Sequence, residues 1–459
     1  MQTKIQPWTW IALAVLILAA TAGRWVSAEH LANPRYNAAK RFSGDEVVYI
    51  VLGDRLWKEG RYDTRGLSDQ LPLDRDRVHI PKYLEAPLFK HPPLFPFLVG
   101  LSRTLFWGVQ GSSIYPSLAM GAISLLAIFW LALELGFAPA QGLLAAFLLA
   151  VSPVHWICSS RIWLDMTLMT LILLAAASQV RAMRFGGWWK WSGFFWGCAL
   201  LTKYTALAPW IFAMAGAVAL RPGLRRDRAF WMGQAVSAGV FLSWLAARLW
   251  FEGWTAAAFW KSDVEDWRTL LRMVRWVWLL PPLVGGVWLW IRCSKQAWWE
   301  KWTGEPRLLA WGTLAFIAGF LAIGDRLPFG SLPWSGYGSN QLRNSPMDFY
   351  LMHQILFEPV CWWGLLGLLL FRRQADLDLV RAVWLGLFLF LTLWGNFQSR
   401  YGLPLVPFEL VFAAALLLPC GNSGNRWGCA LATIWIVFSC ARSLWIVEHV
   451  AIQNQFFYF

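Results

Sequence analysis

Apolar runs of about 20 residues recur along almost the whole chain, and they limit its fold more than any other feature. A helix of that length, rising about 1.5 Å per residue, crosses the roughly 30 Å hydrocarbon core of a bilayer. Only 14% of the 459 residues are charged, against roughly 25% in soluble domains, and 58% are hydrophobic. The sequence therefore predicts an all-α polytopic membrane protein and excludes a set of soluble domains.

Thirteen of the runs are of spanning length or nearly so. They lie at 8–28, 114–134, 140–158, 164–180, 191–203, 204–220, 229–250, 274–291, 308–324, 355–371, 380–395, 403–420 and 428–447. A further run at 94–107 is too short to cross and is predicted to lie along the interface. With a cytoplasmic N-terminus, this arrangement puts nearly twice as many Lys and Arg residues in the short inner loops as in the short outer segments, as the positive-inside rule requires.

We expect one integral membrane domain over residues 1–459, with no soluble domain after the last span. It divides into a first span (8–28), a first extracytoplasmic loop (29–113) and the remaining spans (114–447). In the loop, residues 45–59 have the pattern of an amphipathic helix that Gly60 ends. A second juxtamembrane helix is expected after Pro93.

The net charge of +14 comes mainly from Lys and Arg in the gaps between apolar runs. Because that placement is typical of cytoplasmic loops, nucleic acid is not predicted as a partner. The seven cysteines form no CxxC pair, so neither a zinc site nor a disulfide framework is expected, and no metal or other cofactor is indicated.

Ionisable residues near bilayer depth are costly and mark candidate functional sites. The predicted order of spans brings eight of them to the outer face: Asp45, Glu46, Lys90, His91, Arg161, Asp165, Lys203 and Arg400. The cations suit a lipid phosphate, which Arg grips with two hydrogen bonds. Structural roles remain open for each: Arg161 and Asp165 have the spacing of a helical ion pair, Lys203 and Arg400 have the length to snorkel, and Asp45 can cap its helix.

One acid with several cations favours sugar transfer from a lipid phosphate over hydrolysis. A phosphate leaving group is already a stable anion and needs cations, whereas glycosidases usually need two facing carboxylates. Asp45 is the predicted base, and its neighbour Glu46 points about 100° away on a helix. Direct displacement predicts inversion at the anomeric carbon.

Five short motifs occur in the order of a known family: Gly44-Asp45-Glu46-Val-Val-Tyr49, Lys90-His91-Pro92-Pro93-Leu-Phe-Pro96, Ser159-Ser-Arg161-Ile-Trp-Leu-Asp165, Leu201-Thr-Lys203-Tyr204 and Arg400-Tyr401-Gly-Leu-Pro404. Together they resemble the membrane-embedded GT-C glycosyltransferases of the dolichyl-phosphate-mannose protein mannosyltransferase and aminoarabinose transferase type. Aminoarabinose transferases carry an acid just before the lysine of the proline motif. This chain has Phe89 there, so lipid A as acceptor is not supported.

The resemblance implies a GT-C fold with about thirteen spans, juxtamembrane helices in the first outer loop, and a polyprenyl-phosphate-linked sugar donor. It implies that Asp45 is the catalytic base and that Lys203 and Arg400 contact the donor phosphate. We group Glu46 with the catalytic acid. Tyr401, Arg161, Lys90 and His91 are grouped with the phosphate-binding residues, and Asp165 and Tyr204 are supporting residues.

The expected partners are the polyprenyl-phosphate-linked donor, a lipid, glycan or protein acceptor, and membrane lipids. The expected location is a bacterial inner membrane, with the active site on its extracytoplasmic face. The alternatives are a polytopic transporter or lipid flippase, and a lipid-phosphate-binding subunit without catalysis. Most of the 35 tryptophans are expected at the two interfaces. Those in or beside the outer loops are candidates to stack on a sugar ring: Trp57, Trp163, Trp254, Trp260, Trp267 and Trp334.

Overall fold

A computed structural model of the chain describes residues 5–32, 44–63, 92–107, 109, 111–252, 358–371, 374–393, 399–418 and 426–447. Every regular element among these residues is a helix, which confirms the predicted all-α class. In chain order, with η for short 3-10 helices, they are α1 (Pro7–Ala32), α2 (Gly44–Glu59), α4 (Leu94–Leu105), η2 (Ser112–Ile114), α5 (Tyr115–Glu134), α6 (Pro139–Val151), α7 (Pro153–Ser159), α8 (Leu164–Phe185), α9 (Trp189–Leu200), η3 (Tyr204–Ala206), α10 (Leu207–Leu220), η4 (Pro222–Arg226), α11 (Arg228–Glu252), α18 (Cys361–Leu370), α19 (Ala375–Leu393), η5 (Ser399–Leu405), α20 (Val406–Leu417) and α21 (Arg426–Ile446).

The apolar runs correspond to helices wherever the structure describes them. Six helices among the described residues are long and apolar enough to cross a membrane, and α6 with α7 forms a seventh candidate that bends by 64°. The runs at 274–291 and 308–324 lie outside the described residues. The count of thirteen spans therefore stays a prediction.

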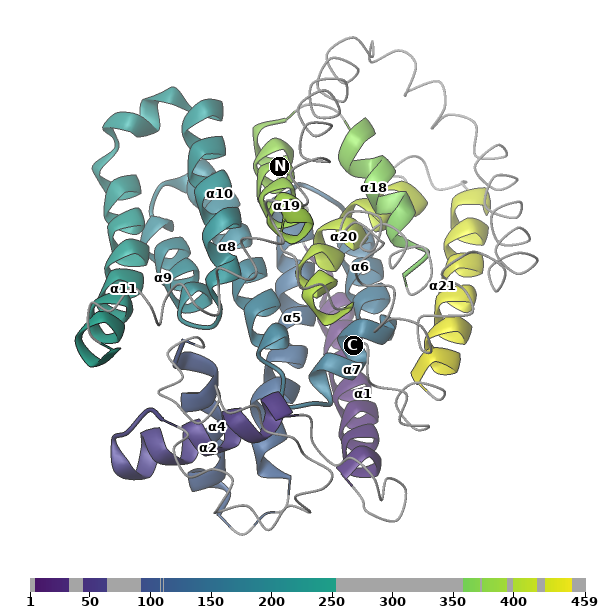
Figure 1. The fold of residues 1–459 in the computed structure, drawn as a ribbon. Helices are drawn as coiled ribbons and strands as arrows, with labels where there is room; N and C mark the ends of the chain where they lie inside the picture. The colour runs from purple at the N-terminus through teal and green to yellow at the C-terminus, as the bar shows by residue number, and fades with distance from the viewer. Residues whose placement is uncertain are drawn as a thin grey trace.

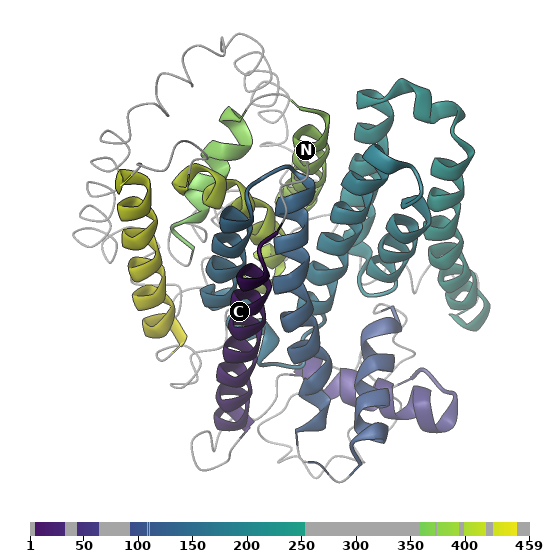
Figure 2. The ribbon, with the colours of Figure 1, turned by 180° about the vertical axis from the view of Figure 1, so that it is seen from behind.

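The helices run side by side as a bundle, and two of them cover one end of it (Figures 1 and 2). The central helices α5 and α8 separate α9, α10 and α11 on one side from α18, α20 and α21 on the other. At the lower end of Figure 1, α2 lies across the bundle direction with α4 beside it. The 12 residues of α4 make about 18 Å of helix, too short to cross a bilayer, as its sequence predicts.

Local sequence explains where α2 begins and ends. Asp45 and Glu46 lie in its first turn, where the positive end of the helix dipole favours acids. Its last helical residue is Glu59, and Gly60 follows with a φ of 63°, a left-handed conformation that glycine adopts at little cost. Both ends agree with the prediction from the sequence.

Glycines set how closely α2 and α4 approach. A Cβ atom on Gly53 would lie 2.4 Å from the carbonyl oxygen of Pro96, and one on Gly100 would lie 2.2 Å from that of Gly53. The two backbones therefore touch where the helices cross, as at the small-residue contacts of membrane helix pairs.

A small apolar cluster beneath this crossing holds α2 and α4 to the bundle. It contains Ala28, Tyr49, Phe95, Val99, Ile114, Leu118, Ile162 and Leu164. The ring of Tyr49 meets that of Phe95 edge to face at 5.3 Å. Because these residues come from α1, α2, α4, η2, α5 and α8, the cluster positions the start of α2 against the bundle.

Candidate active site

Glu46 is held in a buried ion pair. Its carboxylate accepts hydrogen bonds from Arg161 Nε at 2.9 Å and Nη2 at 2.6 Å, and one from the backbone N–H of Ile162 at 3.0 Å. The side chains of Glu46 and Arg161 are 1% and 6% exposed. This two-pronged pairing fixes the start of α2 to the turn between α7 and α8.

Asp45, one residue earlier, is directed to a different cation. Its Oδ2 accepts a hydrogen bond from Arg400 Nη2 at 2.6 Å. The Asp45 side chain is 39% exposed, whereas that of Arg400 is only 7% exposed. Of the two neighbouring acids on α2, Asp45 is therefore the one that is accessible to solvent.

Asp165 lies between two cations that are far apart in the sequence, Lys203 and Arg400. It accepts a hydrogen bond from Lys203 Nζ at 2.7 Å, and its second oxygen is 3.7 Å from Arg400 Nε. The Asp165 side chain is 2% exposed and lies in the first turn of α8, where the helix dipole favours its charge. The cluster of Asp45, Asp165, Lys203 and Arg400 is called the acid–cation cluster below.

Each cation of the site lies at an interruption between helices. Arg161 is in the turn between α7 and α8, and Lys203 has an extended backbone just before η3. Arg400 is in η5, directly before α20. Lys203 and Arg400 are paired at these breaks with Asp165 and Asp45, so acids of the protein engage both cations.

Two aromatic rings, those of Trp163 and Tyr401, each contact two of the cations. The Trp163 ring centre is 5.4 Å from Arg161 Cζ and 5.0 Å from Arg400 Cζ. The Tyr401 ring centre is 3.8 Å from Lys203 Nζ and 5.3 Å from Arg400 Cζ. These distances are those of cation–π contacts.

Trp163 is 2% exposed, and its contacts with two guanidinium groups replace the sugar-stacking role considered from the sequence. Trp57 is 39% exposed and packs on Phe97 of α4 at 5.0 Å between ring centres. The other four candidate tryptophans lie outside the described residues.

Tyr49 lies beneath the acid–cation cluster, one turn into α2. Burial raises the pKa of its phenol well above 10.0, and the negative charge of Asp45 raises it further, while Arg400 lowers it. Tyr49 is therefore a neutral phenol at physiological pH and does not compete with Asp45 as a base.

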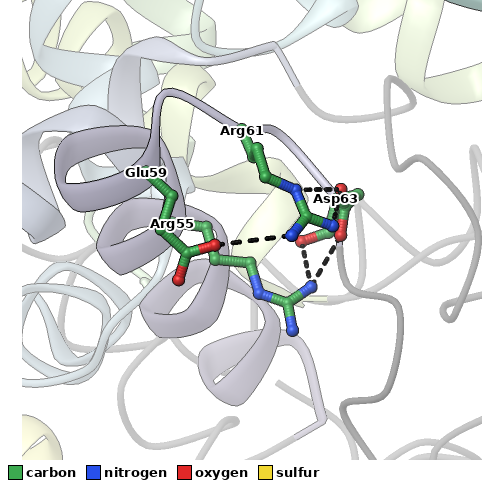
Figure 3. Close-up of polar contacts among 4 residues, drawn as sticks. All are labelled: Arg55, Glu59, Arg61 and Asp63. Atoms are coloured by element: carbon green, nitrogen blue, oxygen red, sulfur yellow. Dashed lines mark hydrogen bonds and ion pairs between the residues drawn. The ribbon is translucent and has the colours of Figure 1, made fainter.

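Ion pairs connect the last turns of α2 to the residues that follow it. Asp63 accepts hydrogen bonds from Arg55 at 2.7 Å and from Arg61 at 2.9 Å, and Glu59 pairs with Arg61 at 3.6 Å (Figure 3). The first of these pairs is mostly buried, so it fixes the chain as it leaves α2.

Tyr62 links the residues after α2 to the helices on the other side of the site. Its hydroxyl donates to the carbonyl of Pro92 at 3.4 Å, and its ring meets Trp244 of α11 edge to face at 5.4 Å. Trp244 Nε1 donates in turn to the hydroxyl of Tyr204 at 3.0 Å. Tyr204 directly follows Lys203, so these contacts connect the chain after α2 to the segment that carries Lys203, and the supporting role of Tyr204 stays a prediction.

Two of the predicted phosphate-binding residues, Lys90 and His91, lie outside the described residues. The later residues of the same motif (90–96) contact the segment that carries Lys203: the Leu94 N–H donates to the carbonyl of Leu201 at 3.0 Å. Leu201 precedes Lys203 by two residues in the break between α9 and η3.

The i,i+4 ion pair considered for Arg161 and Asp165 is not formed. Because α8 begins at Leu164, Arg161 lies outside the helix and turns to Glu46, while Asp165 pairs with Lys203 and Arg400. Among the residues that the structure describes, no three His, Cys, Asp or Glu side chains are grouped closely enough to hold a metal ion.

A second polar cluster beside the site was not predicted as a unit. Arg24 of α1 donates to Nδ1 of His155 at 2.8 Å and to the carbonyl of Ala150 at 2.8 Å. Since arginine only donates, Nδ1 is an acceptor and Nε2 carries the hydrogen that bonds Ser124 at 2.8 Å. The cluster ties α7 to α1 and α5, just before the turn that carries Arg161. The charge of Arg24 inside an apolar run was the signal that could have revealed it.

The comparisons with known proteins agree with this architecture. Residues 90–250 match the family model described as dolichyl-phosphate-mannose-protein mannosyltransferase. No curated protein matches the chain by sequence.

Several solved structures are similar over 98% of this chain, among them structures of the following two proteins. ArnT from Cupriavidus metallidurans, bound to undecaprenyl phosphate, has a TM-score of 0.54 and 13% identity, and the match covers 74% of it. The oligosaccharyltransferase AglB from Archaeoglobus fulgidus, in complex with an inhibitory peptide and a dolichol-phosphate, has a TM-score of 0.55 and 14% identity. This chain spans 56% of the AglB chain. Both proteins are GT-C glycosyltransferases.

Proposed function

We propose that this chain, which has the GT-C fold and resembles the GT-C glycosyltransferases as its motifs predict, transfers a sugar from a polyprenyl-phosphate-linked donor to a lipid, glycan or protein acceptor. The observation that carries the proposal is the partly exposed carboxylate of Asp45 paired with Arg400, in a cluster where Asp165 links Arg400 to a second cation, Lys203. ArnT and AglB each bind a polyprenyl-type phosphate in their structures, which supports the same class of donor here.

The donor phosphate is assigned to Lys203 and Arg400. Both cations belong to the acid–cation cluster, and the Tyr401 ring supports both. A guanidinium and an ammonium together neutralise a phosphate and stabilise the charge that develops on it as the sugar leaves. Arg161 is already engaged by Glu46, so we assign that pair to positioning α2 rather than to the phosphate or the proton.

The transfer step needs one base. Asp45 takes the proton from the acceptor hydroxyl, whose oxygen forms a bond to the anomeric carbon while the bond from that carbon to the phosphate oxygen breaks. The electron pair of the broken bond stays on the phosphate, which leaves as polyprenyl phosphate beside Lys203 and Arg400. Attack opposite the leaving group inverts the anomeric centre.

Asp45→Asn tests the proposal. The amide keeps the shape of the side chain but accepts no proton, so transfer is expected to fall by about 100-fold or more, in the range of general-base catalysis. The measurement is consumption of a labelled polyprenyl-phosphate sugar and release of polyprenyl phosphate in membranes that contain the wild type or the variant. NMR of the product gives the anomeric configuration.

The matched control is Asp54→Asn, on the same helix. Asp54 also pairs with an arginine, Arg103, at 2.9 Å, but it is outside the acid–cation cluster. Transfer by this variant is expected to stay close to wild type. A transporter, a flippase or a non-catalytic subunit would leave the sugar–phosphate bond intact, so a wild type that releases no polyprenyl phosphate would reject the enzyme model.

We place the reaction at the extracytoplasmic face of a bacterial inner membrane. The support is the positive-inside distribution of Lys and Arg, which puts α2, α4 and the acid–cation cluster outside.

A further inference from the structure

We infer that Asp45 is the counterion of Arg400 in the empty site, and that the donor phosphate replaces it there and so releases Asp45 to act as the base. The inference rests on the proposed function and adds to it an order of events. The donor binds before the acceptor hydroxyl can be deprotonated.

The formal charges of the acid–cation cluster support this exchange. Asp45 and Asp165 carry two negative charges, and Lys203 and Arg400 carry two positive ones. Asp165 and Lys203 are 2.7 Å apart, and Asp45 and Arg400 are 2.6 Å apart, so each cation has a close acid. The cluster is thus balanced before a donor arrives.

A donor phosphate disturbs that balance. A phosphodiester donor brings one further negative charge, which must share Arg400 with Asp45 or displace it. Two negative groups at one guanidinium repel each other, so displacement of Asp45 is favoured over sharing of Arg400. The second acid near Arg400, Asp165, makes the longer contact of 3.7 Å, so Asp45 is the closer of the two carboxylates that a phosphate would displace.

The surroundings of the two partners show which one moves. Arg400 is 7% exposed and is held between the rings of Trp163 and Tyr401. The Asp45 side chain is 39% exposed at the tip of α2. Rotation of the Asp45 side chain alone breaks the pair.

The backbone at Asp45 does not need to follow. Glu46, the next residue, keeps its hydrogen bonds to Arg161 and to the backbone of Ile162. The first turn of α2 therefore stays in place while Asp45 turns from the cation toward the acceptor.

The exchange predicts a gain in donor affinity when the charge of Asp45 is removed. If the pair is closed in about nine of ten empty sites, it raises the apparent Kd of the phosphate about tenfold. Asp45→Asn and Asp45→Ala are therefore expected to bind polyprenyl phosphate about tenfold more tightly than the wild type. Asp45→Glu, which keeps the charge, is expected to bind close to wild type.

The experiment titrates each purified full-length protein in detergent with undecaprenyl phosphate and measures binding by a shift in thermal melting or by thermophoresis. Asp54→Asn controls for loss of an ion pair on α2 and is expected to bind as the wild type does. The melting curve without ligand shows that each variant is folded. Asp45→Asn and Asp45→Ala both remove the charge, so if one of them does not fold, the other still tests the inference.

The outcomes separate the exchange from the proposed function. If the neutral variants lose transfer but bind undecaprenyl phosphate no more tightly than the wild type, the exchange is rejected and the transferase proposal stands. If the wild type and every variant fail to bind undecaprenyl phosphate, the donor assignment itself is rejected. Tighter binding by Asp45→Glu as well as by the neutral variants would also contradict the exchange, because a steric change and not charge would then be the cause.

Discussion

At the scale of single residues, the sequence predicts the members of the site better than their pairings. Asp45, Lys203 and Arg400 were chosen because charges near bilayer depth are costly. Periodicity within a helix cannot reveal that Glu46 meets Arg161, because these residues are 115 positions apart and meet through tertiary packing. The cluster of Arg24, His155 and Ser124 escaped prediction for the same reason.

The place of Trp163 between two arginines gives a prediction at this scale. A desolvated cation–π contact contributes about 2 kcal/mol, or roughly 30-fold in affinity. Trp163→Leu removes the aromatic face beneath Arg400, so the KM for the donor is expected to rise by about that factor. Trp163→Phe keeps a weaker ring and is expected to give a smaller rise.

The measurement is donor KM and kcat for the three proteins under one set of conditions. If Trp163→Phe and Trp163→Leu raise the donor KM equally, the loss of side-chain volume, and not the loss of the aromatic ring, would explain the effect. An unchanged KM in both variants would show that Trp163 does not support the phosphate-binding cation.

At the scale of elements, the existence of helices follows from hydropathy, and several ends follow from local chemistry. Gly60 ends α2 as predicted. Hydropathy predicts one span over 140–158, whereas the structure has a bend of 64° between α6 and α7. Ser152 and Pro153 lie at this bend, and the Ser152 side chain accepts a hydrogen bond from the backbone N–H of His155. Hydropathy averages over such a break, because the residues on both sides are apolar.

The contact of Gly53 with α4 gives a prediction for this scale. A Cβ atom in Gly53→Ala would overlap backbone atoms of Pro96 and Gly100, at 2.4 and 2.8 Å, and backbone cannot move aside as a flexible side chain can. The two helices must separate, at a cost of about 1–3 kcal/mol, the range of overpacked cores. Both the melting temperature and the transfer rate are expected to fall, since α2 carries Asp45.

Gly239→Ala on α11 is the matched control. A Cβ atom there meets nothing within 4 Å, and alanine also favours a helix over glycine. This variant is expected to melt at or slightly above the wild-type temperature and to keep full transfer. Equal melting temperatures for Gly53→Ala and Gly239→Ala would contradict the close crossing of α2 and α4.

At the scale of the whole molecule, hydropathy predicts the all-α membrane class, and the GT-C resemblance comes from the five short motifs. The full number of spans stays a prediction. Residues 274–291 and 308–324 lie outside the described structure, so the thirteen-span topology depends on the positive-inside rule. The structure adds that the acid–cation cluster, α2 and α4 share one end of the bundle (Figure 1). A test of which side of the membrane that end faces is therefore also a test of where the proposed reaction occurs.

Cysteine labelling provides that test. Glu59, at the end of α2, is 50% exposed, and Lys190, in the first turn of α9, is also exposed. In a Cys429→Ser background, which removes an exposed native thiol, a membrane-impermeant maleimide is expected to label Glu59→Cys in intact cells. Lys190→Cys is expected to react only after the cells are permeabilised, because the predicted topology places it inside. Labelling of Lys190→Cys but not of Glu59→Cys in intact cells would invert the topology and move the proposed reaction to the cytoplasmic face.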